Sequence, residues 1–218
     1  MKIEDHIIFE DETILVINKP NGLMVEPDRN NHVNLLDIAK KYVFNNFNST
    51  YIQHLHRLDR PTSGLILFTK KREYLHELSN QFAERKVKKF YTAISENFPL
   101  QSKDTLMHWH RKEKKKAKIY DTEFEYTEQA ILTYSTEKVN NKCLWQINLQ
   151  TGKYHQIRAQ LQYINCSIIG DVDYGSKINF ENSFIALHAK ELSFAHPLSK
   201  QLITIQAPTP SQFNNLLI

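Results

Sequence analysis

Short apolar runs of strand length, separated by polar turns, are the feature that most limits how this chain can fold. Helical periodicity is found only in residues 34–47, 71–85 and 154–164. The expected strands cover residues 13–18, 64–69, 90–94, 130–134, 144–149, 184–187, 192–194 and 202–206. Because strands and helices do not alternate regularly, the pattern predicts an α+β fold with a mixed, mostly antiparallel sheet, not a doubly wound one.

The length of 218 residues suits one large domain or two small ones. No internal repeat, low-complexity segment or linker rich in Pro, Gly or Ser divides the sequence. We therefore expect a single domain over residues 1–218, and a monomer by default.

The composition is that of an ordinary globular protein, with 41% hydrophobic and 24% charged residues. No apolar run approaches the roughly 20 residues needed to span a bilayer, and the first residues lack the apolar segment of a signal peptide. Two cysteines, Cys143 and Cys166, do not make a disulfide framework. These observations favour a cytoplasmic protein without a membrane partner.

The sequence contains no recognisable metal or cofactor motif. Neither Cys-x-x-Cys nor His-Glu-x-x-His spacing occurs. The alternating pairs His54/His56 and His108/His110 could each place two ligands on one face of a strand, but no third ligand is near in sequence. We therefore expect no metal and no cofactor.

Positive charge is concentrated rather than spread, although the net charge is only +4. Six basic residues lie within eight positions, opposed only by Glu113: Arg111, Lys112, Lys114, Lys115, Lys116 and Lys118. A second cluster comprises Arg85, Lys86, Lys88 and Lys89. Either cluster alone is as readily a solvated loop or helix end, but together they favour contact with a polyanion through phosphate neutralisation.

Glycine is rare, and its positions point to possible sites. The five glycines each lie in a tight polar cluster: Gly22, Gly64, Gly152, Gly170 and Gly175. A chain that uses glycine so sparingly is expected to place it where the backbone needs positive φ or close approach.

Asp59 lies between Arg57 and Arg60 and directly before the turn-forming segment 61–64. Taken alone, an aspartate that caps this turn and pairs with a neighbouring arginine is the commoner case. The alternative is a carboxylate that adjacent cations keep ionised, because a nearby positive charge lowers the pKa of an aspartate. A carboxylate nucleophile or base needs that state.

Two further segments contain side chains suited to chemistry. In residues 149–158 a strand ends, Gly152 turns and a helix begins, which places His155 and Arg158 on one side of the first helical turn. Arg158 could bind a carboxylate or a phosphate with two hydrogen bonds, although a solvated helix start is the commoner case. In the strand at 90–94, Tyr91 is either a packing residue or a platform for a base.

Six motifs, in order along the chain, resemble those of the RluA-type pseudouridine synthases. They are Asn18-Lys19-Pro20-x-Gly22-Leu23, His56-Arg57-Leu58-Asp59-x-x-Thr62-Ser63-Gly64-Leu65, Lys89-x-Tyr91, Thr151-Gly152-Lys153-x-His155-Gln156-Ile157-Arg158, Gly170-Asp171-x-x-Tyr174-Gly175 and Leu187-His188-Ala189 with His196-Pro197. Six matches in the same order are hard to attribute to chance.

The sequence departs from the family pattern at three places. Lys153 stands where arginine is more common, and Asn165-Cys166-Ser167 stands where a Gly-His-Pro-like turn is common. The small N-terminal RNA-binding domain of many members is expected to be missing. Target recognition is then expected from the catalytic domain itself.

The resemblance implies an isomerase that converts uridine in structured RNA, ribosomal or transfer, to pseudouridine without metal or cofactor. It implies a bent sheet flanked by helices, with a central cleft. Asp59 corresponds to the catalytic aspartate, either as nucleophile or as base. Arg158 would pair with Asp59, Tyr91 would stack on the base, Ile157 would line the base pocket, and Arg57 would fill the gap left by the flipped nucleotide or contact its phosphate. RNA contacts are expected from Lys89, Arg111, Lys112, Lys114, Lys115, Lys116, Lys153 and His155.

Three other functions remain in competition. An RNA-binding protein without catalysis would not need Asp59, Tyr91 and Arg158 together. A hydrolase using Ser63 with His155 or His188 would lack the Gly-x-Ser-x-Gly elbow. A glycosidase would need a second carboxylate beside Asp59, for which Asp171 is the candidate.

Overall fold

A computed structural model describes residues 2–179 and 184–218 of the chain. The chain divides into two compact units, which we describe separately. Unit 1 comprises Met1–Val87 and Ala189–Ala207, and unit 2 comprises Lys88–His188 and Pro208–Ile218. The expectation of one domain over the whole length stays a prediction.

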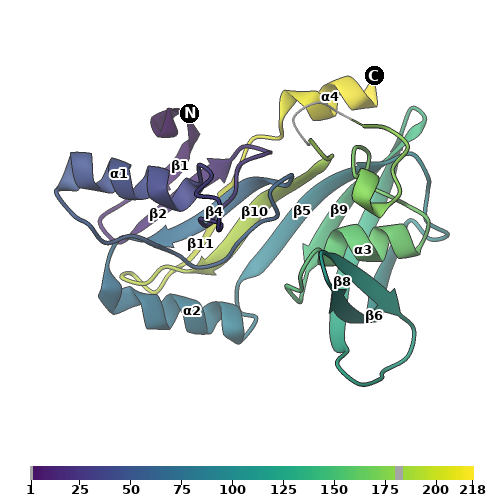
Figure 1. The fold of residues 1–218 in the computed structure, drawn as a ribbon, viewed down its shortest axis with the longest axis horizontal. Helices are drawn as coiled ribbons and strands as arrows, with labels where there is room; N and C mark the ends of the chain where they lie inside the picture. The colour runs from purple at the N-terminus through teal and green to yellow at the C-terminus, as the bar shows by residue number, and fades with distance from the viewer. Residues whose placement is uncertain (1, 180–183) are drawn as a thin grey trace. The chain divides into compact units, whose positions relative to one another are not determined.

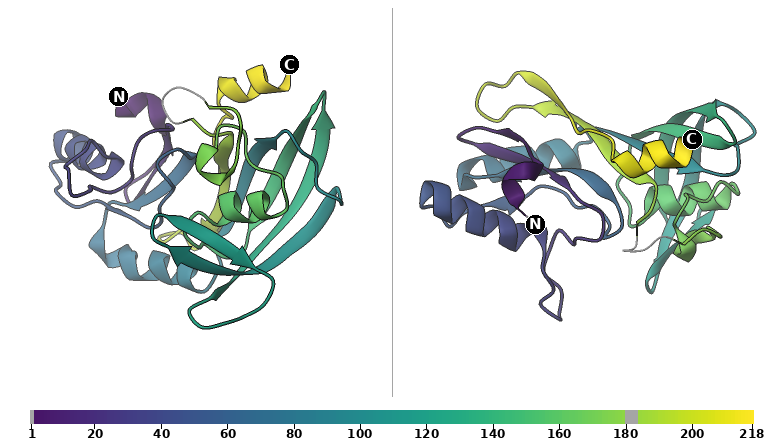
Figure 2. Two further views of the ribbon diagram at one scale, coloured as in Figure 1. Left: turned by 45° about the vertical axis from the view of Figure 1, so that its right-hand side comes forward. Right: turned by 90° about the horizontal axis from the view of Figure 1, so that it is seen from above.

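Unit 1 is a sheet with helices on its two sides. Its strands are β1 (Ile7–Glu10), β2 (Ile14–Lys19), β3 (Gln53–His54), β4 (Ser63–Thr69), β10 (Leu187–Ala195, in this unit from Ala189 on) and β11 (Leu202–Gln206). Its helices are η1 (Ile3–His6), α1 (Leu35–Phe47), η2 (Arg72–Tyr74) and α2 (Leu75–Ala83). In Figures 1 and 2, α1 and α2 lie on opposite sides of these strands.

The sheet of unit 1 has the strand order β1-β2-β4-β10-β11, with β3 paired to the end of β4. Strands β2 and β4 run antiparallel in a register that places Lys19 opposite Gly64. Every residue of β4 is buried, as its unbroken apolar run predicted. Because alternate residues face opposite sides of a sheet, this burial requires cover on both faces. The register also brings the loop after β2 beside the loop before β4.

The first helix begins where the sequence predicted. The Asn34 side chain accepts a hydrogen bond of 3.0 Å from the backbone N–H of Asp37, which is the N-cap geometry expected of asparagine. The helix buries Leu35, Leu36, Ala39 and Val43. Helix α2 contributes Leu78 to a hydrophobic cluster that also contains residues of β2 and β4. Packing on both helices therefore holds the loops of this unit in place.

Unit 2 is an antiparallel sheet in the order β5-β9-β8-β6-β7. The strands are β5 (Lys88–Ser95), β6 (Lys103–Glu113), β7 (Lys116–Tyr120), β8 (Glu128–Val139) and β9 (Lys142–Leu149). The helices are α3 (Gln156–Tyr163), η3 (Val172–Tyr174) and α4 (Ser211–Leu217). Helix α4, which the sequence analysis did not predict, buries Phe213.

Three strand predictions need correction. Strand β8 alternates between buried and partly exposed residues instead of being buried throughout, because only its Ala130, Leu132 and Tyr134 lie on the covered face. No strand was predicted for the basic residues from 111 to 118, which lie in strands β6 and β7 and their connecting turn. The run expected at 184–187 belongs to strand β10 only at Leu187, and the run expected at 192–194 lies within the same strand.

Along the part of the chain that the structure describes, no helix is both long enough and apolar enough to cross a bilayer.

Candidate functional site

Asp59 lies at the start of a tight turn in unit 1. The backbone N–H of Thr62 donates to the Asp59 carbonyl at 3.1 Å, which closes the turn before β4. The preceding Leu58 is buried, and the side chain of Asp59 is half-buried. The turn therefore has the position that the segment 61–64 predicted.

Lys19, the last residue of β2, is completely buried beside this turn. Its ammonium group donates to the carbonyls of Pro20 at 2.9 Å, Leu23 at 2.7 Å and Arg60 at 3.2 Å. Burial lowers the pKa of Lys19 to about 7, and the negative charge of Asp59 opposes that shift. Lys19 thus ties the loop after β2 to the residue that follows Asp59.

The same two loops are joined by a second pair of contacts. The N–H of Gly22 donates to the Arg60 carbonyl at 2.8 Å, and Nε of Arg60 donates to the Gly22 carbonyl at 3.0 Å. Gly22 has a positive φ of 79°, which favours glycine at this position. In each of these contacts the acceptor is a main-chain carbonyl, so they fix the backbone of the two loops.

Gly64 is required by the contact between β4 and β10. It has a φ of 117°, and a Cβ atom built on it would lie 2.3 Å from the backbone oxygen of Ala189. No side chain fits there without moving the backbone. The Pro-Thr-Ser-Gly segment thus marks a close approach of two backbones, as its glycine indicated.

Arg57 and His56 lie before Asp59 but make different contacts. The Arg57 side chain is 66% exposed and pairs with Glu26 at 2.9 Å, and Glu26 also pairs with His54. Nε2 of His56 accepts from the Leu67 N–H at 3.1 Å, and its ring stacks on Phe82. Arg57 is therefore at the surface, whereas His56 has a structural role.

Arg158, in α3 of unit 2, is almost completely buried against an acidic partner. Its Nε and one Nη donate to the two carboxylate oxygens of Asp171 at 2.7 and 2.8 Å. The guanidinium group also lies over the Tyr174 ring, 4.8 Å from its centroid. The sequence predicted a bidentate contact for Arg158, and the partner found in this unit is Asp171. The pairing with Asp59 stays a prediction.

The ion pair of Asp171 with Arg158 argues against a glycosidase in which Asp171 is the second catalytic carboxylate. It is 1% exposed and accepts both bonds from Arg158. A carboxylate fixed in this way is a support for the arginine.

His155 immediately precedes α3 and has a left-handed backbone, with a φ of 51°. Its ring stacks on Tyr154 with centroids 3.8 Å apart, and Nδ1 lies 3.0 Å from the Tyr174 hydroxyl. A non-glycine residue in this conformation is uncommon and is held by its surroundings. His155 and Arg158 both contact Tyr174, although His155 precedes α3 and does not lie in its first turn as the sequence predicted.

Tyr91 and Ile157 are both buried in unit 2. Tyr91 lies in β5 opposite Ile147, and 7% of it is exposed. Ile157 is the second residue of α3. The Lys89 amine lies close to Gly152, and Lys153 pairs with Glu128. The third and fourth motifs therefore meet at the turn before α3.

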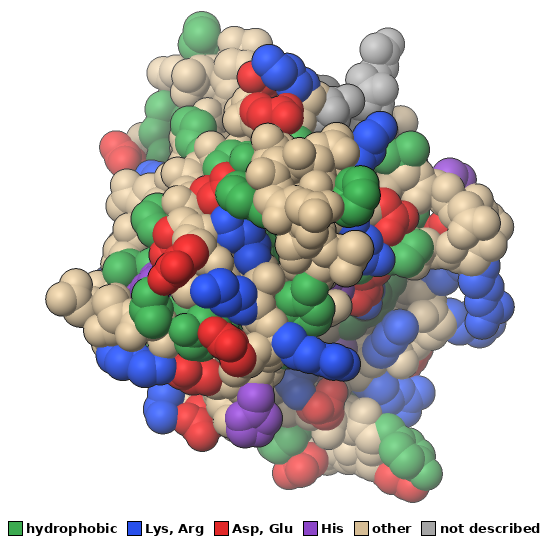
Figure 3. Space-filling model, turned by 90° about the vertical axis from the view of Figure 1, so that its left-hand side faces the viewer, with side chains coloured by type: hydrophobic (Ala, Val, Ile, Leu, Met, Phe, Trp, Pro, Cys, Tyr) green, Lys and Arg blue, Asp and Glu red, His purple; other side chains and the backbone are tan. Residues whose placement is uncertain are grey.

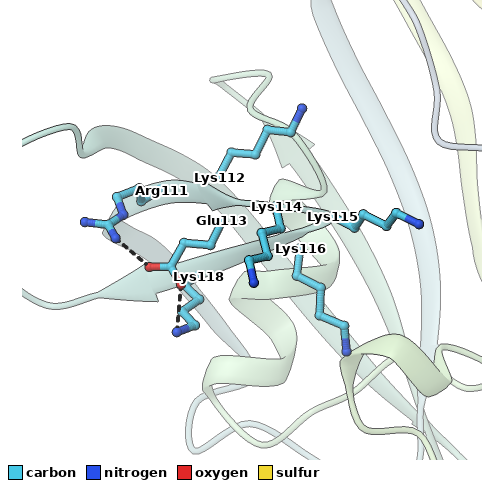
Figure 4. A pocket seen from close by; sticks show the side chains of 7 residues that line it. All are labelled: Arg111, Lys112, Glu113, Lys114, Lys115, Lys116 and Lys118. Atoms are coloured by element: carbon cyan, nitrogen blue, oxygen red, sulfur yellow. Dashed lines mark ion pairs between the residues drawn. The ribbon is translucent and has the colours of Figure 1, made fainter.

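The hairpin of β6 and β7 presents the basic cluster, which lines a hollow of about 750 Å³. Glu113 pairs with Arg111 at 3.0 Å and with Lys118 at 2.8 Å, and these contacts lower the pKa of the Glu113 carboxyl, chiefly through Lys118. Figure 4 shows Lys112 and Lys115 pointing away from Glu113. Over most of the face drawn in Figure 3, by contrast, basic and acidic side chains are interspersed. The hairpin thus concentrates positive charge.

The alternating histidines have separate roles within the described residues. His108 bonds to Gln160 at 3.1 Å, and Nε2 of His110 bonds to the Tyr154 carbonyl at 2.8 Å. In residues 2–179 and 184–218, no three His, Cys, Asp or Glu side chains gather as a ligand set.

The expected site residues therefore fall into two groups. Unit 1 contains Asp59 and Arg57, together with Lys19, to which the sequence analysis assigned no role. Unit 2 contains Tyr91, Ile157 and Arg158, with the basic hairpin. The sequence did contain a signal for Lys19, because this lysine directly follows the apolar run 13–18 and precedes the turn at Pro20.

Known proteins are similar to this chain both in sequence and in fold. Residues 13–163 match the RNA pseudouridylate synthase family. A ribosomal large subunit pseudouridine synthase C of Rickettsia prowazekii is 32% identical over 99% of this chain and 72% of its own length. A tRNA pseudouridine synthase C of Vibrio parahaemolyticus is 30% identical over 98% of this chain and 94% of its own length.

A solved structure supports the fold. The human RNA pseudouridylate synthase domain containing 4 superposes with a TM-score of 0.82 over 97% of this chain and 91% of that structure, at 21% identity. The α+β fold predicted from the strand pattern is confirmed.

Proposed function

This chain belongs to the RNA pseudouridylate synthase family, and we propose that it converts specific uridines of structured RNA to pseudouridine with Asp59 as the catalytic carboxylate. The reaction breaks the bond from N1 of the base to C1′ of the ribose. It then joins C5 of the base to C1′, while the C5 proton leaves and N1 gains one. Product and substrate are isomers, so no external reagent is consumed.

The observation that supports Asp59 is its geometry. Its carboxylate is half-buried at the start of a turn held by main-chain hydrogen bonds, and its charge acts on the buried ammonium group of Lys19. A carboxylate on a rigid turn is suited to approach one atom of a substrate, because little motion remains to be lost. It acts on C1′ as a nucleophile or as the base that starts bond cleavage.

The other site residues take the roles that family membership suggests. Arg158 pairs with Asp59, Tyr91 stacks on the uracil ring, and Ile157 lines the base pocket in a central cleft. A stacked uridine cannot expose C1′ and C5, so it must leave its stack at a cost of a few kcal/mol. Arg57, exposed at the surface, fills the resulting gap or contacts the phosphate.

The RNA partner is a ribosomal or a transfer RNA, as the names of the relatives suggest, and the protein acts in the cytoplasm. Phosphate contacts come from the hairpin residues Arg111, Lys112, Lys114, Lys115 and Lys116 and from Lys89, Lys153 and His155. Such contacts supply most of the affinity of a protein for RNA when the sequence is not read directly. The protein acts as a monomer.

Site-resolved mapping of pseudouridine in total RNA tests this proposal. Cells without the gene should lose one or a few sites, and the wild-type gene should restore them. Asp59→Asn should not, because the neutral amide lowers the rate by about a thousandfold or more. Asp28→Asn is a matched control in the same unit, since Asp28 bonds only within its own loop in the contacts found here.

The variants should also be compared in vitro by release of tritium from C5 of labelled uridine. An Asp59→Asn protein that still releases tritium at the wild-type rate would contradict the role of Asp59. Unchanged pseudouridine in cells lacking the gene would point instead to an RNA-binding protein without catalysis.

A further inference from the structure

The short segment Asp171–Tyr174, which we call the arginine turn, is shared by two functional parts of unit 2. It contacts Arg158 on one side and the basic hairpin on the other. The turn includes η3 and is closed by a hydrogen bond of 3.0 Å from the Tyr174 N–H to the Asp171 carbonyl.

The contacts found for the Arg158 guanidinium group in unit 2 fall on this turn. Asp171 accepts two hydrogen bonds from it, and the Asp173 carboxylate lies 3.8 Å from Nη2. The Tyr174 ring lies under the guanidinium plane. The turn is therefore the seat on which the arginine is positioned.

The hairpin contacts the same turn through two further hydrogen bonds. Nζ of Lys116 donates to the Asp173 carbonyl at 2.7 Å. The Ala117 N–H donates to the Tyr174 hydroxyl at 2.7 Å, and both groups are buried. Ala117 and Ile119 of the hairpin also pack with Tyr174 and with Ala159 of α3. A displacement of the hairpin would therefore displace the turn.

A line of aromatic rings makes a second connection between hairpin and turn. Nζ of Lys112 lies 4.5 Å from the centroid of the Tyr154 ring. The Tyr154 ring stacks on His155, whose Nδ1 reaches the Tyr174 hydroxyl. The left-handed backbone of His155 sets this line, since it turns the ring toward Tyr174.

We propose that the basic hairpin positions Arg158 through the arginine turn, with Tyr174 as the main positioning residue, so that RNA bound to the hairpin favours the reactive arrangement of the arginine. The inference rests on the proposed function. RNA phosphates bound by the lysines restrain the hairpin, and the hydrogen bonds at Lys116 and Ala117 pass that restraint to the turn. RNA can act in this way only if it binds one arrangement of the hairpin and the arginine turn more tightly than another, here the arrangement in which both are ordered.

Tyr174→Phe is the direct test, because it removes the hydroxyl and keeps the ring under Arg158. We expect kcat to fall about tenfold and KM for a transcript containing the mapped uridine to change less than about twofold. Tyr163→Phe is the matched control: Tyr163 ends α3, the helix that carries Arg158, and its hydroxyl donates to the surface residue Asp121 at 2.7 Å. It should leave both constants unchanged.

Coupling requires more than one sensitive residue. Tyr154→Leu, which breaks the ring line at a half-exposed position, should also lower kcat. The double variant with Tyr174→Phe should lose no more than Tyr174→Phe alone, since the ring line through Tyr154 ends at the Tyr174 hydroxyl that Tyr174→Phe already removes. Tyr154→Leu also provides the test if Tyr174→Phe does not fold.

The Nε–H signal of Arg158 gives a readout independent of turnover. In nuclear magnetic resonance of ¹⁵N-labelled protein, exchange of this proton with solvent should slow when the transcript is added to wild type. In Tyr174→Phe that slowing should be absent, although the transcript still binds.

Independent losses in the double variant, or equal slowing in both proteins, would overturn the coupling. Those results would leave the proposed function intact. A wild-type protein that modifies no uridine would contradict the proposed function instead.

Discussion

The turn of Asp59 and the turn that supports Arg158 are held by different kinds of contact. Asp59 follows a buried leucine and begins a turn closed by the main chain, with Gly22, Lys19 and Gly64 fixing the neighbouring backbone. Arg158 is held by side chains, through a bidentate ion pair and the Tyr174 ring.

The difference indicates how each region responds to change. The residues that hold the backbone of the Asp59 turn, such as Gly64 and Lys19, cannot be changed without strain or an unpaired carbonyl, so substitutions of them should act on folding. A side chain held by other side chains can be displaced while the fold persists, so substitutions there should act mainly on activity. The effects below run from the largest expected to the smallest.

Gly64→Ala tests whether the backbone around the Asp59 turn is essential for folding. The new Cβ would meet the Ala189 backbone and would require a left-handed φ, so we expect a loss of at least about 3 kcal/mol in the free energy of unfolding. Gly152→Ala is the control, because its Cβ would meet only the flexible end of Lys89, 3.3 Å away. Urea denaturation measures both, and similar small losses would contradict the role of Gly64.

Arg158→Lys tests the side-chain side. Lysine keeps the charge but cannot make the two parallel bonds to Asp171, so a buried carboxylate loses part of its hydrogen bonding. We expect a stability loss of about 2 kcal/mol with a folded protein, and a fall in kcat of about a hundredfold. Arg57→Lys, at an exposed ion pair, should cost less than about 0.5 kcal/mol. An Arg158→Lys protein with the kcat of wild type would contradict the expectation that changes around Arg158 act mainly on activity.

Lys19→Met removes a titrating group beside the Asp59 turn, so it tests whether Lys19 makes the stability of the protein depend on pH. Unfolded Lys19 keeps its proton to a pKa near 10.5, but the folded residue releases it near 7. Between these values the unfolded state binds more protons, so stability rises with pH in wild type. Relative to Lys19→Met, the free energy of unfolding should rise by about 2 kcal/mol from about pH 7.5 to 9.5. Parallel pH curves for the two proteins would contradict the lowered pKa of the buried Lys19.

Lys114→Ala with Lys115→Ala changes only exposed side chains of unit 2, so the fold should not be affected. We expect KM for RNA to rise about tenfold and its dependence on salt to weaken, with stability unchanged. The pair Arg111→Ala with Lys118→Ala should have a smaller effect, because Glu113 already neutralises part of their charge. An equal effect of the two pairs would show that this ion pairing does not matter for binding.

Local patterns in the sequence were sufficient for most of the elements. The Asn34 cap, the buried strand β4 and the turn after Asp59 each follow from a few adjacent residues. The five glycines were a good guide as well, since four of them have positive φ and Gly152 does not. Local chemistry fixes such features because the interacting groups are close along the chain.

Other features depended on partners far away in sequence. Lys19 stood in a recognised motif, but its value as a buried cation depends on the carbonyl of Arg60, 41 residues on. No strands were predicted for the basic hairpin, because the alternation of buried Ala117 and Ile119 is masked by the lysines between and around them. Strand β8 was expected to be buried, because its alternation is hidden by apolar residues on both faces.

The sequence alone determined the family and the α+β fold and led to the proposed site residues, because each of these rests on short motifs and apolar runs whose order along the chain is visible. The tertiary structure decided which residues hold them: Lys19 and Gly64 around Asp59, and Asp171 and Tyr174 around Arg158. The physical reason is that a motif fixes its own backbone, whereas burial, charge and hydrogen-bond partners are set by segments that meet only when the chain folds.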